Sequence, residues 1–168
     1  MTDRLTARLS LHLVDGAEAE RIAARSAAEG DGWADDFPAD GEVIGATAFL
    51  MTVEARGDQG PFGFYRITRT SDGKAIGGIG FRGRPSDGCA EVGYGLAPSA
   101  RGSGYAAEAL VAALAIAADH GATRVVAETD EGNVASQRTL ERAGFRRVGG
   151  EGEPCMYEVF VGVGSGAS

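Results

Sequence analysis

One stretch near the middle of the chain, residues 91–106, limits the possible folds more than any other part. It reads as an apolar strand, a short loop and a Gly-rich turn, and the residues beyond it predict a long helix. A second apolar strand, residues 124–129, follows that helix, and a parallel pair of strands requires such a crossover. The turn also presents backbone N–H groups at the positive end of the helix dipole, where anions bind. We therefore expect a phosphate-bearing ligand at residues 101–106.

The remaining sequence predicts a single mixed α/β domain with a largely antiparallel sheet. Turn sequences at residues 71–73 and 85–88 separate three strands with hairpin spacing. We expect strands at residues 5–13, 62–70, 74–82, 89–96, 124–129, 145–149 and 156–163, and helices at residues 17–28, 41–54, 102–120 and 133–144. The domain then covers residues 1–163, and residues 164–168 form a frayed tail.

Composition limits the partners of this chain. Its 168 residues suffice to bury a core, and its formal net charge of −8 argues against a nucleic-acid surface. Cys89 and Cys155 form no CxxC pair and lie in predicted strands, so we expect two reduced, buried thiols. The sequence shows neither a secretory leader nor a membrane-spanning run, and no metal site is expected. These features predict a cytoplasmic protein that does not bind a membrane.

Two phosphate-binding motifs compete for the turn. A P-loop requires a Lys followed by Ser or Thr after its last glycine, and this turn has neither in register, so a P-loop is excluded. The dinucleotide fingerprint matches Gly102, Gly104 and Ala107, with Glu128 as a ribose partner, and it would indicate a nicotinamide-dependent oxidoreductase. Residues 97–101 separate the strand from the glycines, however, where that fingerprint requires a tight turn.

A second cluster opens the helix at residues 133–144. Asn133 is a good N-cap, and the Ser136 hydroxyl lies at the same helix end. Both side chains could face a ligand between this helix and the preceding one.

Together these motifs resemble a known family. Arg101-x-x-Gly104-x-Ala106 is similar to the Arg/Gln-x-x-Gly-x-Gly/Ala signature of the GNAT-superfamily N-acetyltransferases. Asn133-x-x-Ser136, followed by residues 140–145, resembles the corresponding helix of the ribosomal-protein-alanine N-acetyltransferase (Rim-type) branch. The element order agrees over nearly the whole chain. The resemblance implies a GNAT-like fold whose parallel crossover is splayed to hold acetyl-CoA.

The resemblance also implies a set of cofactor-binding residues. Pantetheine would bond to the strand edge at Gly95, Leu96 and Ala97, next to a bulge that opens the sheet, and the Leu96 N–H would polarise the thioester carbonyl. Asn133 and Ser136 would contact the cofactor arm. The backbone N–H groups of the turn would bind the pyrophosphate, and the arginine of the turn would add positive charge. The residues concerned are Arg101, Gly102, Ser103, Gly104, Tyr105 and Ala106.

The implied reaction is direct attack of a primary amine on the thioester. A carboxylate must remove the ammonium proton, and Glu128 and Glu91 are the candidates. Many family members protonate the thiolate with a Tyr, but Leu140 stands at that position. The acid is then Ser136, Tyr94, Tyr157 or water.

The acceptor is a small-molecule amine or a peptide N-terminus. Trp33, Phe37 and Tyr94 are candidate substrate-binding residues, and acids crowd residues 31–42. Aromatics and acids suit a cationic amine, but the same aromatics could fill the core beneath a solvated loop. A non-catalytic acyl-CoA-binding module remains an alternative, and the late strands leave an edge for a possible homodimer.

Overall fold

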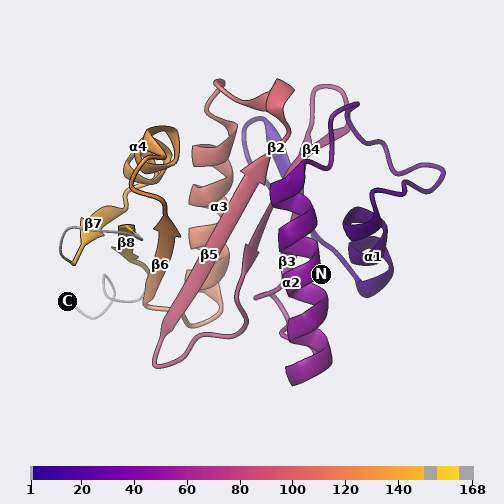
Figure 1. Cartoon of the computed structure of the whole chain (residues 1–168). Coiled ribbons are helices and arrows are strands. Elements are labelled where there is room, and N and C mark those ends of the chain that lie inside the picture. Colours follow the sequence, from indigo (N-terminus) through magenta and orange to yellow (C-terminus); the bar gives the residue numbers. More distant parts are fainter. Residues whose placement is uncertain (1, 150–154, 163–168) are drawn as a thin grey trace.

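The computed structural model describes residues 2–149 and 155–162, and its elements follow the order that the sequence predicts (Figure 1). Within these residues the strands are β1 (Arg4–Leu5), β2 (Leu9–Leu13), β3 (Phe64–Arg69), β4 (Lys74–Phe81), β5 (Cys89–Leu96), β6 (Arg124–Thr129), β7 (Arg146–Val148) and β8 (Cys155–Phe160). The helices are α1 (Gly16–Ala24), α2 (Asp40–Arg56), α3 (Tyr105–Asp119) and α4 (Val134–Arg142), with a short 3-10 turn, η1 (Pro98–Ala100), after β5.

The described strands have the order β1-β2-β3-β4-β5-β6-β8-β7, and among these strands only β5 and β6 pair in parallel. This confirms the mixed α/β fold. The parallel pairing spans three residues of β5, Cys89 to Glu91, whereas the antiparallel pairing of β5 with β4 continues to Leu96. Past Glu91 the two strands separate, and the gap widens toward the top of Figure 1. The register between β4 and β5 is continuous, so the bulge expected near Gly95 is not there.

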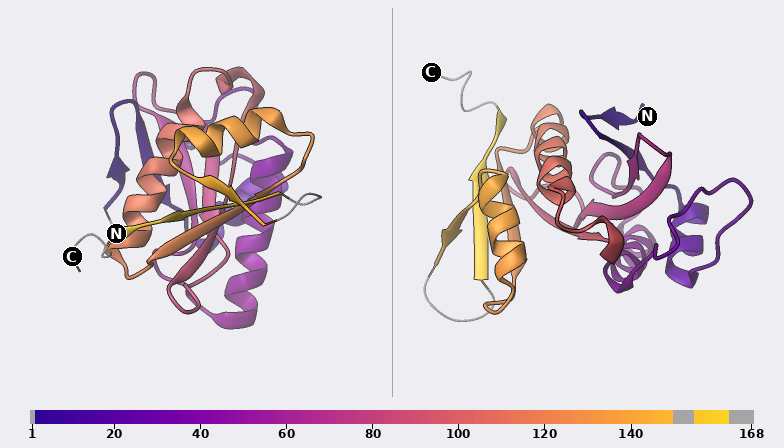
Figure 2. Two further views of the ribbon diagram at one scale, coloured as in Figure 1. Left: turned by 90° about the vertical axis from the view of Figure 1, so that its left-hand side faces the viewer. Right: turned by 90° about the horizontal axis from the view of Figure 1, so that it is seen from above.

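Helices cover both faces of the sheet (Figure 2). α1 and α2 lie on one face, over a cluster that contains Ile22, Phe37 and Phe64. α3 lies on the other face, over the larger core that contains Leu11, Ile79 and Leu110. The crossover helix thus packs back on its own sheet, as a parallel connection requires.

The strand expected at residues 5–13 is instead a hairpin, because β1 turns back and pairs with β2. The Thr6 hydroxyl accepts the Leu9 N–H at 3.0 Å and donates to Glu108 of α3 at 2.5 Å. The same Glu108 carboxylate accepts the Arg8 N–H at 2.9 Å. A contact from a distant helix therefore breaks a strand that the apolar alternation alone would extend.

Other differences are local. α1 ends at Ala24 rather than at residue 28, because Arg25 takes a left-handed conformation. Cys155 is buried as expected, whereas Cys89 is partly exposed. The expected tail at residues 164–168 lies outside the described residues.

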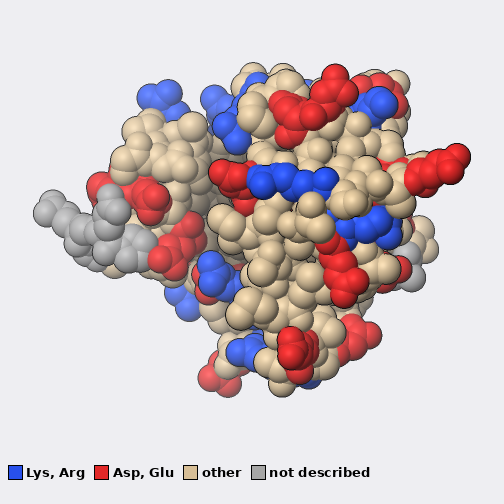
Figure 3. Space-filling view, turned by 45° about the vertical axis from the view of Figure 1, so that its right-hand side comes forward, with Lys and Arg blue, Asp and Glu red and all other residues tan. Residues whose placement is uncertain are grey.

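The surface carries charges of both signs. On the face in Figure 3, acidic and basic side chains are interspersed, and the described residues of that face form no continuous basic patch. Within residues 2–149 and 155–162, every helix is too short or too polar to cross a bilayer.

Candidate active site

Where β5 separates from β6, a cavity of about 610 Å³ lies between the end of β5, the start of α3 and α4. Antiparallel pairs alternate in their hydrogen bonding, and the Ala97 N–H donates to the Ile76 carbonyl of the β4 side at 2.7 Å. The backbone groups of Leu96 therefore point the other way, into the gap. Its carbonyl accepts the Arg101 Nε–H at 3.2 Å. An exposed strand edge with a cation beside it is what an extended polar ligand can bind.

The Gly-rich turn forms one end of this cavity. Gly102 and Gly104 have φ of 86° and 83°, a left-handed conformation that favours glycine, so the helix begins only at Tyr105. Arg8 holds the turn from outside: its Nη1 donates to the Ser103 carbonyl at 2.9 Å, and its guanidinium lies 4.4 Å from the centroid of the Tyr105 ring. The turn is thus fixed before any anion arrives.

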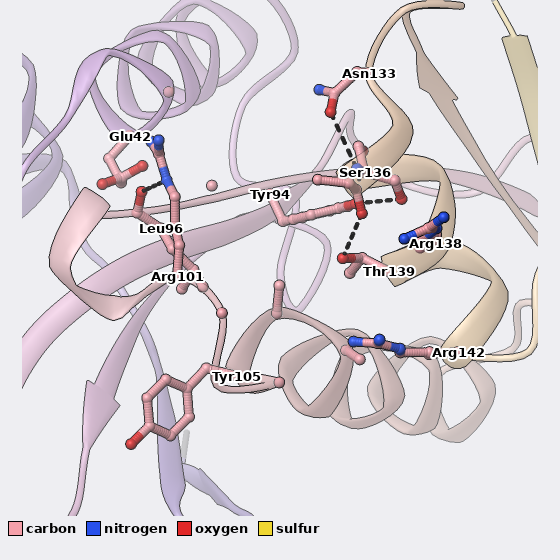
Figure 4. A pocket seen from close by; sticks show the side chains of 17 residues that line it. Glu42, Tyr94, Leu96, Arg101, Tyr105, Asn133, Ser136, Arg138, Thr139 and Arg142 are labelled. Carbon is pink, nitrogen blue, oxygen red and sulfur yellow. Dashed lines mark hydrogen bonds between the residues drawn. The ribbon is translucent and has the colours of Figure 1, made fainter.

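α4 forms the opposite wall and carries two further cations. Asn133 caps the helix by accepting the Ser136 N–H at 3.1 Å, as the sequence predicts. Arg138 and Arg142 are four residues apart, so they share a helix face, and both line the cavity (Figure 4). With Arg101 on the facing side, three guanidinium groups border the space. This charge suits a ligand with several phosphates.

A hydrogen bond crosses the gap between β5 and α4. The Tyr94 hydroxyl lies 2.8 Å from Ser136 Oγ, and either group can be the donor (Figure 4). Burial raises the pKa of Tyr94, and the bond to Ser136 partly opposes this rise. Tyr94 therefore keeps its proton at neutral pH and can act as a proton donor.

Glu42 is a buried carboxyl at the edge of the same cavity. It lies in the first turn of α2, its side chain is 1% exposed, and its Oε1 accepts the Ala39 N–H at 3.1 Å. Its Oε2 is buried and has no hydrogen-bond partner among the described residues. Burial raises the pKa of Glu42, against a smaller lowering by the Ala39 N–H. A carboxyl in this state binds a proton more readily than an exposed glutamate does.

A second cavity of about 590 Å³ lies between α2 and the β4–β5 sheet face. It meets the first cavity at Gly41, Tyr94 and Gly95, which line both. Its walls are largely apolar and include Ile44, Phe49, Met51, Phe64 and Phe81, with Arg56 and Arg82 also in its lining. Two ligands could therefore meet at Tyr94 from different sides of the sheet.

Most of the expected cofactor residues line the first cavity. These are Gly95, Leu96, Arg101, Gly102, Gly104, Tyr105, Ala106, Asn133 and Ser136. Ala97 does not, because it is fully buried in the core beneath α1 and α2. Ser103 lies in the turn with its carbonyl bound to Arg8.

The two expected catalytic carboxylates lie outside both cavities. Glu91 pairs with Arg82 at 3.1 Å, and Glu128 is exposed on β6. Tyr157, a candidate acid, is buried in the core. Glu128 is thus also poorly placed for the ribose of a dinucleotide, and η1 occupies the position where that fold needs a tight turn.

Trp33 and Phe37, expected to bind substrate, pack against each other with ring centroids 5.3 Å apart in the core beneath α1 and α2. Neither lines a cavity. The acids around them have structural partners: Asp31 binds Arg21, and Asp36 accepts the Ser99 N–H and hydroxyl. These contacts lower the pKa of both carboxyls. The geometry gives the loop a packing role.

Among the charged lining residues, sequence reasoning did not place Arg138 and Arg142 at the cavity, and it counted Glu42 only among the acids of residues 31–42. The two arginines could have been found, because they lie four residues apart on one face of the helix that Asn133 caps. Glu42 gives no such signal, since its place depends on how α2 packs against β5.

Comparison with known proteins agrees with this architecture. A family model described as Acetyltransferase (GNAT) domain matches residues 8–146. No curated protein sequence matches the chain significantly. Many solved structures share the fold, among them the following three. A ribosomal-protein-S5-alanine acetyltransferase from Vibrio fischeri has a TM-score of 0.69 and 14% identity, and the alignment covers 96% of this chain and 97% of that one.

The other two structures contain coenzyme A. RimL, a ribosomal L7/L12 alpha-N-protein acetyltransferase, was solved in complex with coenzyme A and has a TM-score of 0.66 and 18% identity, with 95% and 98% of the two chains covered. Mycobacterium smegmatis RimJ, in complex with CoA-disulfide, has a TM-score of 0.63 and 20% identity, with 90% and 81% covered.

Proposed function

Because this chain belongs to the GNAT acetyltransferase family, we propose that it is a cytoplasmic enzyme that transfers the acetyl group of acetyl-CoA to a primary amine. The acceptor is a protein N-terminus or a small-molecule amine. One observation carries the proposal: the cavity between β5 and α4 joins an exposed strand edge, a Gly-rich turn at a helix N-terminus and three arginines. That combination matches the pantetheine arm and the phosphates of acetyl-CoA.

The cofactor would lie along the gap. Backbone N–H groups of the turn at Gly102 to Ala106 would bind the pyrophosphate at the N-terminus of α3. Arg101, Arg138 and Arg142 would add charge-assisted hydrogen bonds to phosphates. The Leu96 N–H would stabilise the negative charge that develops on the thioester oxygen.

The acceptor would approach through the second cavity and meet the thioester near Tyr94. The largely apolar walls favour an amine that carries an apolar group. Arg56 and Arg82, which line this second cavity, disfavour a polycationic acceptor. When the C–S bond breaks, the Tyr94–Ser136 pair can protonate the departing thiolate, because it lies where the two cavities meet.

A thiol-release assay tests this proposal. The protein is mixed with acetyl-CoA and a panel of polyamines, amino acids, small apolar amines and N-terminal peptides. We expect release that depends on the acceptor, with apolar amines or peptides ahead of polyamines. Tyr94→Phe should lower kcat about 10- to 100-fold without weakening acetyl-CoA binding. Tight binding of acetyl-CoA without release for any acceptor would instead favour the non-catalytic binding module.

A further inference from the structure

We propose that Glu42 is the group that takes the proton from the attacking amine. This inference deepens the proposed acetyl transfer and rests on it. It assigns the base to α2, on the acceptor side of the sheet, rather than to the carboxylates of β5 or β6.

The position of Glu42 is the first argument. Its neighbour Gly41 and the facing Gly95 line both cavities, and Glu42 itself lines the first. A Cβ on Gly95 would lie 2.7 Å from Glu42 Oε2, so this oxygen sits directly against β5, one residue from Tyr94. The carboxyl therefore lies beside Gly41 and Gly95, where the two cavities meet, and Figure 4 shows it among the residues that line the first cavity.

The hydrogen bonding of Glu42 is the second argument. Its Oε1 is held by the Ala39 N–H, which fixes the orientation of the carboxyl. Its Oε2 is buried without a partner in the part of the chain that the structure describes. A buried polar atom without a partner costs free energy, so natural proteins keep few of them. A bound ammonium would supply the missing donor.

The surroundings of Glu42 also suit a base. Arg101 favours the charged form of the carboxyl, Asp36 opposes it, and burial is the largest influence and raises the pKa. A general base works best when its pKa lies near the working pH. Glu91 and Glu128 lack this setting, because the first forms an ion pair with Arg82 and the second is exposed.

The protons balance with one base and one acid. Glu42 Oε2 takes a proton from the ammonium, and the free amine attacks the thioester carbon to form the C–N bond. Collapse of the tetrahedral intermediate breaks the C–S bond, and the nitrogen loses a second proton. The Tyr94–Ser136 pair donates one proton to the thiolate. The second proton lost by the nitrogen then reprotonates this pair. Glu42 then releases its proton to water.

The test compares Glu42→Gln with the wild type, using the best acceptor from the thiol-release panel. Gln keeps the volume and can still accept the Ala39 N–H, but it cannot take a proton. We expect kcat/KM to fall about 100- to 1000-fold near pH 7, with coenzyme A affinity unchanged. The defect should shrink as pH rises toward the pKa of the amine, because solvent then supplies free amine. Glu54→Gln, at an exposed position of the same helix, is the matched control and should retain full activity.

Each contrary outcome is distinct. An E42Q enzyme within twofold of the wild type, or one with an equal defect at every pH, overturns the role of Glu42 and leaves acetyl transfer intact. A wild type that releases no thiol with any acceptor overturns the proposed function itself. If E42Q fails to bind coenzyme A, Glu42→Ala is assayed with added formate. Restored turnover supports a base at this position, and the absence of rescue counts against it.

Discussion

Two buried carboxyls show how the surroundings of a side chain decide its chemistry. Glu158 on β8 is 6% exposed, but Arg124 and Arg146 bind its two oxygens at 2.7 and 2.9 Å. These contacts lower its pKa. Glu42 is more deeply buried and has no such ion pair among the described residues, and its pKa is raised. Glu158 therefore stabilises the fold through its two ion pairs, whereas Glu42 is a group that can exchange a proton.

This contrast predicts opposite effects of pH on stability. A raised pKa means that the folded protein binds more protons than the unfolded chain, so Glu42 favours folding at low pH. That contribution is lost as pH rises through its folded-state pKa. Urea unfolding should therefore show the wild type losing stability relative to Glu42→Gln as pH rises above the ordinary glutamate pKa of about 4.3. For Glu158→Gln we expect the opposite dependence. The wild type should be more stable than this variant at neutral pH, and the difference in the free energy of unfolding should disappear as pH falls. Parallel pH curves for both variants would contradict this account.

At the scale of elements, the site depends on close contact between α2 and β5. Gly41 and Gly95 face each other, and a Cβ on Gly95 would lie 3.6 Å from the Gly41 Cα and 2.7 Å from Glu42 Oε2. A methyl group at Gly95 would displace the Glu42 carboxylate, whereas its contact with Gly41 would be an ordinary one. The glycine therefore leaves room for this carboxylate against the strand.

Gly95→Ala should destabilise the protein by about 1–3 kcal/mol, as overpacking does. Gly93→Ala is the matched control on the same face of β5, where an added Cβ meets nothing within 4 Å. That change should be neutral or slightly stabilising, since alanine loses less backbone entropy on folding. Urea unfolding of both variants measures the difference, and equal midpoints would show that α2 does not rest on Gly95.

The sequence predicted those elements whose signals are local. The bounds of β5 and β6 agree with the structure, and Asn133 caps α4 as expected. Features set by distant contacts were missed. Glu108 breaks the first strand from more than 100 residues away, and Glu42 reaches the site only because α2 packs on β5. Glu91 and Glu128 were plausible from spacing, but the sequence does not reveal that one is paired and the other exposed.

At the scale of the whole molecule, the sheet is two parts with a narrow connection. Within the described sheet, the part from β1 to β5 and the part from β6 to β7 are joined by the short parallel pairing of β5 with β6, while the core beneath α3 and the Tyr94–Ser136 bond also connect them. A ligand in the gap would touch β5 and α3 on one side and α4 on the other. It would therefore join the two parts.

Coenzyme A should raise the melting temperature accordingly. A ligand at 100 times its Kd adds about 2.7 kcal/mol, which corresponds to a rise of roughly 5–10 °C for a domain of this size. NADH at the same concentration should leave the midpoint unchanged, and the double variant Arg138→Ala, Arg142→Ala should show a smaller rise with coenzyme A. Equal shifts with both ligands would argue against the site in the gap.

Arg8 gives the start of the chain an influence on this distant site. Its guanidinium supports the Ser103 carbonyl, 95 positions away, as well as the Tyr105 ring and the Glu108 carboxylate. An N-terminal tag or truncation that disturbed the β1–β2 hairpin would weaken the support that Arg8 gives to the Gly-rich turn. The backbone N–H groups of that turn would then be held less firmly for binding a diphosphate. Such a change would weaken the binding of coenzyme A before any loss of overall structure.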